Sequence, residues 1–318
     1  MLARVAESLY WMARYLERAE NTARLINGST QLLLDLPRGA HFGWDVLLKV
    51  AGLDELYAQH NGPADEDGII RFLVEDTRNP SSILSCIRYA RENTRTFREV
   101  LPMEIWERIN ALYLHARAHA AEAGQGRGPR YTLLNGIIER RQSVLGLLAE
   151  SMSHDAAYQF LRLGRSVERA DMTTRILDIN AAVHLPRGAA PGAVPERLWM
   201  GTLNALSAYQ MYRRHVGVHV SGEAVVGFLL TDTRFPRAVL HCLGEIEGAL
   251  ASLPQATAPL KLLRKAWRRV ERLPLAQLPG LALHDYLDQV QHDLAALGDA
   301  IARQYFQLDY SLPPATQQ

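Results

Sequence analysis

The stretch RYLERAENTAR, residues 14–24, returns far downstream as RSVERADMTTR, residues 165–175. Six of its eleven positions are identical in the two copies, and Asp171 stands where the first copy has Glu20. In the first copy, apolar residues recur at steps of three or four along residues 9–26, which is the period of one face of an α-helix. The stretch therefore predicts a long amphipathic helix that occurs twice.

Two further segments repeat in the same order. FLVEDTRNPSSILSC (72–86) is matched by FLLTDTRFPRAVLHC (228–242), and Trp44, Leu48, Tyr57 and His60 have counterparts 155 residues later. The three offsets are 151, 155 and 156, so the matches are collinear. Collinear matches indicate a duplication. We predict two tandem copies, residues 1–152 and 153–318, packed as one body.

Within each copy the periodicity is helical. Amphipathic stretches cover 2–34, 44–60, 66–76, 80–99, 102–122 and 130–150, then 195–215, 222–231, 236–251, 256–272 and 283–309. Proline- and glycine-rich segments (DLPRGAHFG and LPRGAAPGAVP) end the two long helices. GQGRGPR (124–130) is the longest expected loop, and HVGVHV (215–220) is the single β-like run. The fold class predicted is all-α, with about six helices in each copy.

Composition excludes some partners. The 318 residues carry a formal net charge of +1, which gives no reason to expect nucleic acid or an anionic membrane. No stretch approaches the roughly 20 apolar residues of a membrane span, and the N-terminus does not resemble a signal peptide. The chain has two cysteines, Cys86 and Cys242, which argues against a disulfide framework and favours a reducing compartment. We therefore expect a cytoplasmic protein.

The repeated helix carries its charges beside the apolar stripe. On a helical wheel Arg14, Glu17, Glu20 and Arg24 fall in one arc, where Arg14 can pair with Glu17 and Glu20 with Arg24. Charges that border a core need partners, so we expect a neighbouring helix to supply them. The two Asp-Thr-Arg turns are expected to add charges to the network. The candidate residues are Arg14, Glu17, Arg18, Glu20, Arg24, Arg165, Glu168, Arg169, Asp171 and Arg175, with Asp76, Arg78, Asp232 and Arg234 in the turns.

Three interpretations of these arcs remain open. They can form a structural ion-pair lattice, or a pocket in which surplus arginines bind carboxylate or phosphate. They can also form a dinuclear metal site, although di-iron bundles use a Glu-x-x-His element and few nearby cations. No nucleotide-binding or nucleophile motif is present, and no cofactor or metal is predicted.

The sequence resembles the bacterial alpha-E proteins. The resemblance rests on MLARVAESLYWMARYLERAENTARLI at the start, FLRLGRSVERADMTTRIL (160–177), the DTRNP turn and the closing RQYF (303–306), and it covers nearly the whole chain. It implies an all-helical fold and a charged site at the ten arc residues. Alpha-E proteins are typically encoded beside, or fused to, a circularly permuted ATP-grasp protein, often with a transglutaminase-like protease. This gene association implies a role in ATP-dependent amide or peptide bond formation.

The leading hypothesis is an accessory or substrate-presenting subunit of a separate ATP-grasp amide ligase, whose partners are the ligase and a peptide or carboxylate substrate. One alternative is a stand-alone enzyme that uses Glu17, Glu20, Glu168 and Asp171 as acid–base groups or metal ligands. The other is a scaffold without a catalytic role.

Overall fold

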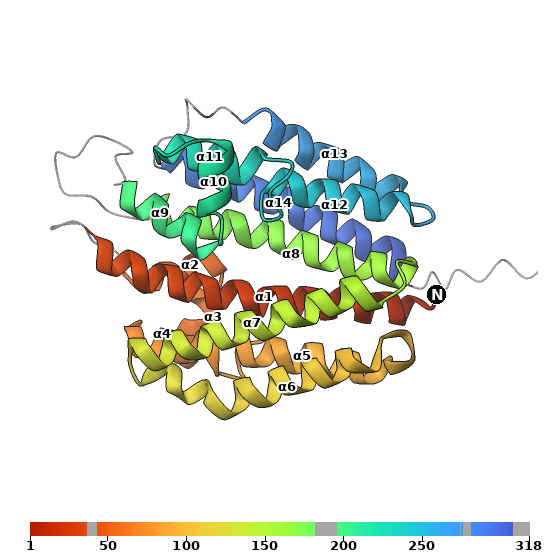
Figure 1. Ribbon diagram of the computed structural model, residues 1–318, viewed down its shortest axis with the longest axis horizontal. Coiled ribbons are helices and arrows are strands. Elements are labelled where there is room, and N and C mark those ends of the chain that lie inside the picture. The colour runs from red at the N-terminus through yellow and green to blue at the C-terminus, as the bar shows by residue number, and fades with distance from the viewer. Residues whose placement is uncertain (37–42, 182–195, 274, 276–280, 308–318) are drawn as a thin grey trace, which may run out of the picture.

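The computed structural model describes residues 1–36, 43–181, 196–273, 275 and 281–307 (Figure 1). The described residues form fourteen α-helices and two short 3-10 helices, and none of them forms a β-strand. The prediction of an all-α fold is confirmed. The α-helices are α1 (Ala3–Asp35), α2 (Asp45–Ala51), α3 (Asp54–His60), α4 (Glu66–Val74), α5 (Ile83–Thr96), α6 (Met103–His119), α7 (Arg127–Ser151), α8 (Ala156–Ala181), α9 (Glu196–Ala205), α10 (Tyr209–His215), α11 (Gly222–Thr231), α12 (Val239–Ala251), α13 (Thr257–Glu271) and α14 (Leu281–Tyr305).

Helices α1 and α8 lie side by side at the centre of the molecule and carry the repeated stretch. Helices α5 and α7 pack on α1, and α6 packs on α5 and α7. In the same way α12 and α14 pack on α8, and α13 packs on α12 and α14, which gives two four-helix groups (Figure 1). The apolar stripe of α1 is buried as its spacing predicts, at Leu9, Met12, Leu16, Ala19 and Ala23. The border of that stripe, where the charged arc lies, therefore faces the interface between the two groups.

The helices occur in the same order in both halves. Each half begins with a long helix, continues with three short ones and ends with three helices that complete the four-helix group. The contacts are also reciprocal, because α9 packs on α1 while α2 packs on α8. Helix α7 ends at Ser151 and α8 begins at Ala156, so the predicted boundary at 152/153 falls in the connection between them. The duplication remains a prediction with which this arrangement agrees.

Some local predictions were wrong. The stretch 44–60 is two helices, α2 and α3, because Gly52 adopts a left-handed conformation (φ 67°) and its N–H donates to the carbonyl of Lys49. The stretch 195–215 divides in the same way near Ser207 (φ 53°), although residue 195 lies outside the described residues. The expected loop 124–130 is helical from Arg127, because proline is tolerated in a first turn.

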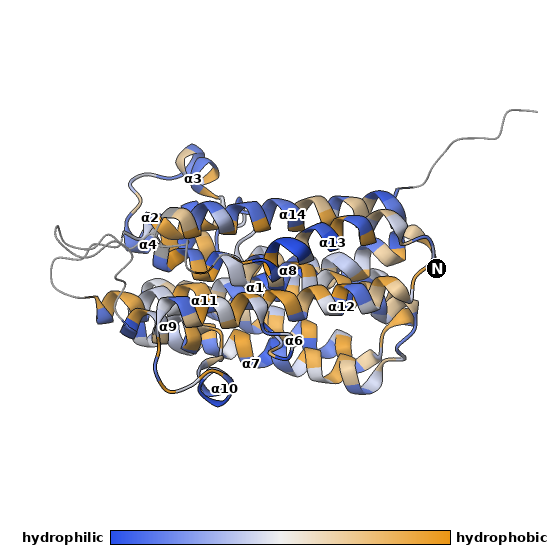
Figure 2. Ribbon diagram, turned by 90° about the horizontal axis from the view of Figure 1, so that it is seen from above, coloured by the Kyte–Doolittle hydropathy of each residue, from blue (hydrophilic) through white to orange (hydrophobic). Residues whose placement is uncertain are grey.

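The remaining local predictions concern chain ends and loops. Residues 216–220 of the β-like run follow α10 as irregular chain. The segments LPRGAAPGAVP and 37–42 lie outside the described residues, as do residues 308 and 309 of the last predicted helix. Hydrophilic and hydrophobic residues are interspersed along the long helices (Figure 2). None of the described helices is long and apolar enough to span a membrane.

Candidate functional site: two buried glutamate–arginine clusters

The two charged arcs face each other across the contact between α1 and α8 and exchange their charges. Arg169 of α8 binds Glu17 of α1 through two hydrogen bonds, Nε to Oε1 at 2.8 Å and Nη2 to Oε2 at 3.0 Å. Arg18 of α1 binds Glu168 of α8 in the same bidentate way, at 2.5 and 3.0 Å. Each Glu-Arg dipeptide of the repeat thus pairs with the other. Bidentate guanidinium–carboxylate pairs are strong and orientation-specific, so they fix how the central helices cross.

The cluster around Glu17 and Glu20 is completely buried. Both glutamates have an exposed fraction of 0%, and their oxygens contact the guanidinium groups of Arg141 from α7 and Arg237 from the turn before α12. The side-chain amide of Asn21 donates to Glu17 Oε1 at 3.1 Å. We call this set, with its other arginines, the Glu17–Glu20 cluster; its charged members are Glu17, Glu20, Arg24, Arg141, Arg169 and Arg237.

Arg24 connects this cluster to α9. Its Nε donates to Glu20 Oε1 at 2.8 Å, which confirms the predicted i,i+4 pair. Its Nη1 donates to the carbonyl of Ala205 at 2.9 Å and to Ser207 Oγ at 3.0 Å. Arg141 Nη1 lies 2.7 Å from the buried Glu20 Oε2, as an ion pair that lacks hydrogen-bond geometry. The acids of α1 are therefore held by arginines from four different parts of the chain.

A second, smaller cluster surrounds Glu168. Arg14 Nε donates to Glu168 Oε2 at 2.8 Å, and the guanidinium of Arg14 lies 5.0 Å from the ring centre of Trp11. The predicted pairing of Arg14 with Glu17 is wrong, because the carboxylate of the facing helix provides the acceptor. Arg14, Arg18 and Glu168 form what we call the Glu168 cluster. Nearby, Arg175 pairs with Asp171 at 2.7 Å and donates to the carbonyl of Val50.

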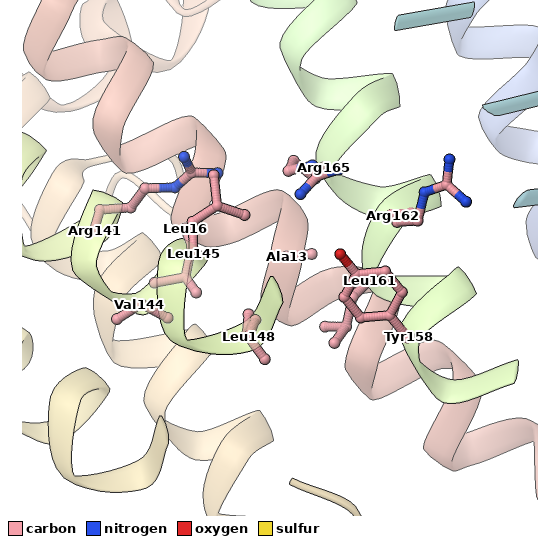
Figure 3. A pocket seen from close by; sticks show the side chains of 10 residues that line it. All are labelled: Ala13, Leu16, Arg141, Val144, Leu145, Leu148, Tyr158, Leu161, Arg162 and Arg165. Carbon is pink, nitrogen blue, oxygen red and sulfur yellow. The ribbon is translucent and has the colours of Figure 1, made fainter. Parts of the chain in front are cut away.

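Arg165 does not join either cluster. Its Nη2 contacts Glu245 Oε2 at 3.4 Å, and its buried Nε has no hydrogen-bond partner among the described residues. Figure 3 shows Arg165 and Arg162 on α8 and Arg141 on α7 around a small pocket with an apolar floor. The pocket holds about 20 Å³, little more than the roughly 10–15 Å³ that one water requires. It is too small for a substrate.

The two Asp-Thr-Arg turns stay outside the clusters, contrary to expectation. Arg78 pairs with Asp76 in its own turn and is exposed, and Asp232 accepts hydrogen bonds from the backbone N–H groups of Arg234 and Phe235. Aspartate commonly closes turns in this way. The charge that enters the Glu17–Glu20 cluster comes instead from Arg237, three residues beyond Arg234.

The arginines keep the buried glutamates ionised. Burial alone would raise the pKa of Glu17, but Arg141, Arg169 and Arg237 hold it well below the usual value. Burial also opposes ionisation of Glu168, whose pKa Arg18 and Arg14 lower to about 2. Burial lowers the pKa of Arg237 to about 10. Since a general acid or base works best with a pKa near the operating pH, these carboxylates are poorly suited to proton transfer.

The same contacts bear on metal binding. A metal would have to displace guanidinium groups that already occupy the oxygens of Glu17 and Glu20. The described residues also contain no group of three or more histidine, cysteine, aspartate or glutamate side chains arranged to hold an ion. The geometry therefore favours the structural lattice over a dinuclear site.

Cys86 and Cys242 occupy equivalent buried places. The thiol of Cys86 lies 3.7 Å from the carbonyl of Pro80, and that of Cys242 lies 3.6 Å from the carbonyl of Pro236. Burial raises the pKa of both thiols to about 12. They are therefore packed side chains rather than nucleophiles.

These features define an all-α protein whose two long central helices are locked by exchanged glutamate–arginine pairs. A family model described as "Alpha-E: A predicted alpha-helical domain with a conserved ER motif" matches residues 1–306, so the chain belongs to the Alpha-E family. Of the Glu-Arg dipeptides in this chain, 17–18 and 168–169 are the two that make the reciprocal buried pairs.

The chain is similar to mycobacterial proteins whose names assign no function. It is 25% identical over 272 residues to uncharacterized protein Mb2597 of Mycobacterium bovis and 24% identical to uncharacterized protein Rv2567 of Mycobacterium tuberculosis. Each match covers 79% of this chain and 30% of the relative, so the matched region is less than a third of the relatives' length. No solved structure matches the chain.

Proposed function

We propose that this protein is the helical accessory subunit of a separate ATP-grasp amide or peptide ligase, and that it presents a peptide or carboxylate substrate to that enzyme. The observation that carries the proposal is the state of the duplicated acids. Glu17, Glu20 and Glu168 are buried and bound to arginines, which suits a rigid binding body better than a stand-alone acid–base enzyme.

A polar cavity of about 510 Å³ supports the binding role. It lies between α1, α7 and α9 and is lined by the arginines Arg24, Arg127 and Arg130 and by amide side chains such as Asn27 and Asn135. Arg24 and Arg130 already have partners, whereas Arg127 is exposed and makes no ion pair with a described residue. Arginine forks and amides suit the carboxylate and backbone groups of a peptide.

The alpha-E resemblance supplies the partner in this proposal, since such proteins are typically encoded beside, or fused to, a circularly permuted ATP-grasp protein. The greater length of the mycobacterial relatives is compatible with a helical body that works together with another segment. A cytoplasmic location belongs to the same proposal. ATP is available there, and the two cysteines are free and buried rather than joined.

The test is ATP turnover by the ATP-grasp protein that the proposal names as partner, with and without this chain, over a panel of amino acids and short peptides. We expect turnover that requires both proteins. Arg127→Glu reverses the charge in the cavity and should lower that turnover at least tenfold. Arg264→Glu, the same substitution at another exposed arginine, on α13, should not. Identical turnover with and without this chain would overturn the ligase proposal, and a stable complex with unchanged turnover would identify a scaffold.

A further inference from the structure

A second cavity, of about 220 Å³, lies beside the Glu168 cluster. Its polar wall contains Arg18, Ser81, Glu168, Asp171 and Arg175, and an apolar wall includes Leu25 and Leu73. Gly52 on its wall is exposed, so the cavity opens at the turn between α2 and α3. Its volume is many times the roughly 10–15 Å³ that one water requires.

The surroundings of this cavity are built like those of the Glu17–Glu20 cluster. The repeat matches Glu168 to Glu17 and Asp171 to Glu20. The matched arginines behave alike: Arg24 donates to the carbonyl of Ala205, and Arg175 donates to that of Val50, 155 residues earlier (205 − 50). The turns that contain Ser81 and Arg237 have the same local contact, because Cys86 contacts the carbonyl of Pro80 and Cys242 contacts that of Pro236. The cavity can therefore be compared with the cluster position by position.

One position differs in a decisive way. Ser81 stands where the second copy has Arg237, with the same offset of 156 (237 − 81) as the two cysteines (242 − 86). The guanidinium of Arg237 contacts both Glu17 Oε1 and Glu20 Oε1 and donates to Asn21 Oδ1 at 3.0 Å. The side chain of Ser81 is far shorter, and Asp171 is one methylene shorter than Glu20. Ser81, Glu168 and Asp171 all line the cavity, so it lies at the place that the repeat assigns to the side chain of Arg237.

The charges around the two places are the same in number. Arg237 lies among two carboxylates, Glu17 and Glu20, and three other guanidinium groups, Arg24, Arg141 and Arg169. The cavity is lined by two carboxylates, Glu168 and Asp171, and by the guanidinium groups of Arg18 and Arg175, while a third guanidinium, that of Arg14, binds Glu168 without lining the cavity. The fold already accommodates one more guanidinium in such a setting.

Glu168 and Asp171, which line the cavity, each have a carboxylate oxygen that can accept a further hydrogen bond. Glu168 Oε1 accepts one hydrogen bond, from Arg18 Nε, and Asp171 Oδ1 accepts only a long one of 3.4 Å from Arg175. A carboxylate oxygen has two lone pairs and can accept more than one donor. The apolar wall beside these oxygens suits the methylene stem of an arginine-like chain.

We propose that this cavity binds a guanidinium group, which bridges Glu168 and Asp171 as Arg237 bridges Glu17 and Glu20. The ligand is an alkylguanidine, either a free small molecule or the arginine side chain of a peptide. The site is independent of the ligase proposal, since it follows from the chain's own repeat.

The test measures binding to the full chain by calorimetry, with methylguanidinium chloride and agmatine as probes at millimolar concentration. N-methylurea, a neutral analogue, and sodium acetate are the controls. We expect saturable binding of one equivalent of each guanidinium compound and none of the controls. N-acetylarginine amide separates the two sources, because a peptide site binds it and a site closed to peptides binds agmatine alone. Absence of saturable guanidinium binding, or displacement by acetate, overturns the proposal.

Three variants place the binding in this cavity. Ser81→Arg supplies the missing side chain and should abolish binding, and Asp171→Asn, a smaller change, should weaken it at least tenfold. Arg237→Ser opens the matching place and should raise the stoichiometry from one to two, with methylguanidinium restoring part of the lost melting temperature. Circular dichroism confirms that each variant is folded. Unchanged binding by both Ser81→Arg and Asp171→Asn overturns the assignment.

Discussion

At the scale of single residues, the molecule concentrates its charge in places that normally exclude it. Glu17, Glu20 and Glu168 are at most 1% exposed, and each is neutralised by arginines. Burying a charge is costly, and the loss of one partner leaves the other uncompensated. The clusters are therefore where single substitutions should have their largest effects.

Glu168→Gln should reduce the free energy of unfolding by about 3–5 kcal/mol at neutral pH, because it leaves Arg14 and Arg18 without their carboxylate. Urea unfolding measures this. Glu92→Gln is the matched control, since Glu92 is 42% exposed beside Arg95 and such pairs contribute at most about 1 kcal/mol.

The same variant carries a pH signature. The pKa of Glu168 is about 2 in the folded protein, below the roughly 4.3 of a glutamate in an unfolded chain. The stability that ionised Glu168 contributes is therefore complete above about pH 4.3 and is lost as the pH falls toward 2. The stability difference between the wild type and Glu168→Gln should thus be constant above about pH 5 and shrink below it. A difference that does not depend on pH would contradict this assignment of the ionised carboxylate.

The sequence identified much of this site but not all of it. The arcs and their need for partners followed from the helical wheel, yet no sequence rule showed that the arcs would face each other. Arg141 was missed although it interrupts the apolar stripe of α7 between Ile137 and Val144. Arg237 was missed although it stands where the first copy has Ser81, directly after a proline that both copies share. An arginine at an apolar position and a mismatch within a repeat were the two available signals.

At the scale of elements, helix existence was predictable and helix division was not. The periodicity placed all the long helices, but one residue, Gly52, divides the stretch 44–60 because its left-handed conformation ends α2. Periodicity persists through such a break, since both short helices pack on the same core. Periodicity also does not show where two helices come into close contact. Helices α1 and α8 approach each other closely at Gly164.

A Cβ atom at Gly164 would lie 2.1 Å from the carbonyl oxygen of Tyr10, which is backbone and cannot move aside. Gly164→Ala should therefore push α8 away from α1 and cost at least about 1–3 kcal/mol, as overpacking does. Gly146→Ala on α7 is the control: its Cβ would meet nothing within 4 Å, so it should gain about 0.5–1 kcal/mol. The melting temperatures of the two variants should shift in opposite directions. An unchanged melting temperature for Gly164→Ala would disprove the close contact.

At the scale of the whole molecule, the two halves complete each other's buried charges. Glu17 and Glu20 of the first half depend on Arg169 and Arg237 of the second, and Glu168 of the second half depends on Arg14 and Arg18 of the first. Helix α9 also covers α1, while α2 covers α8. A half on its own would expose the side of its long helix that packs on the other long helix, and its buried glutamates would lose the arginines that the other half supplies. We therefore expect the halves to fold only together.

The fragments 1–152 and 153–318, expressed separately, should each lack a cooperative melting transition, whereas an equimolar mixture should recover one. The intact chain should unfold in a single transition with equal calorimetric and van't Hoff enthalpies, although chains longer than about 150 residues often do not. Differential scanning calorimetry measures both. The double variant Glu17→Gln, Glu168→Gln removes the exchanged carboxylates, so its fragments should fail to associate even though the apolar faces are unchanged. A fragment that melts cooperatively alone would mean that apolar packing within one four-helix group is sufficient, and that the exchanged pairs only orient two independently stable bodies.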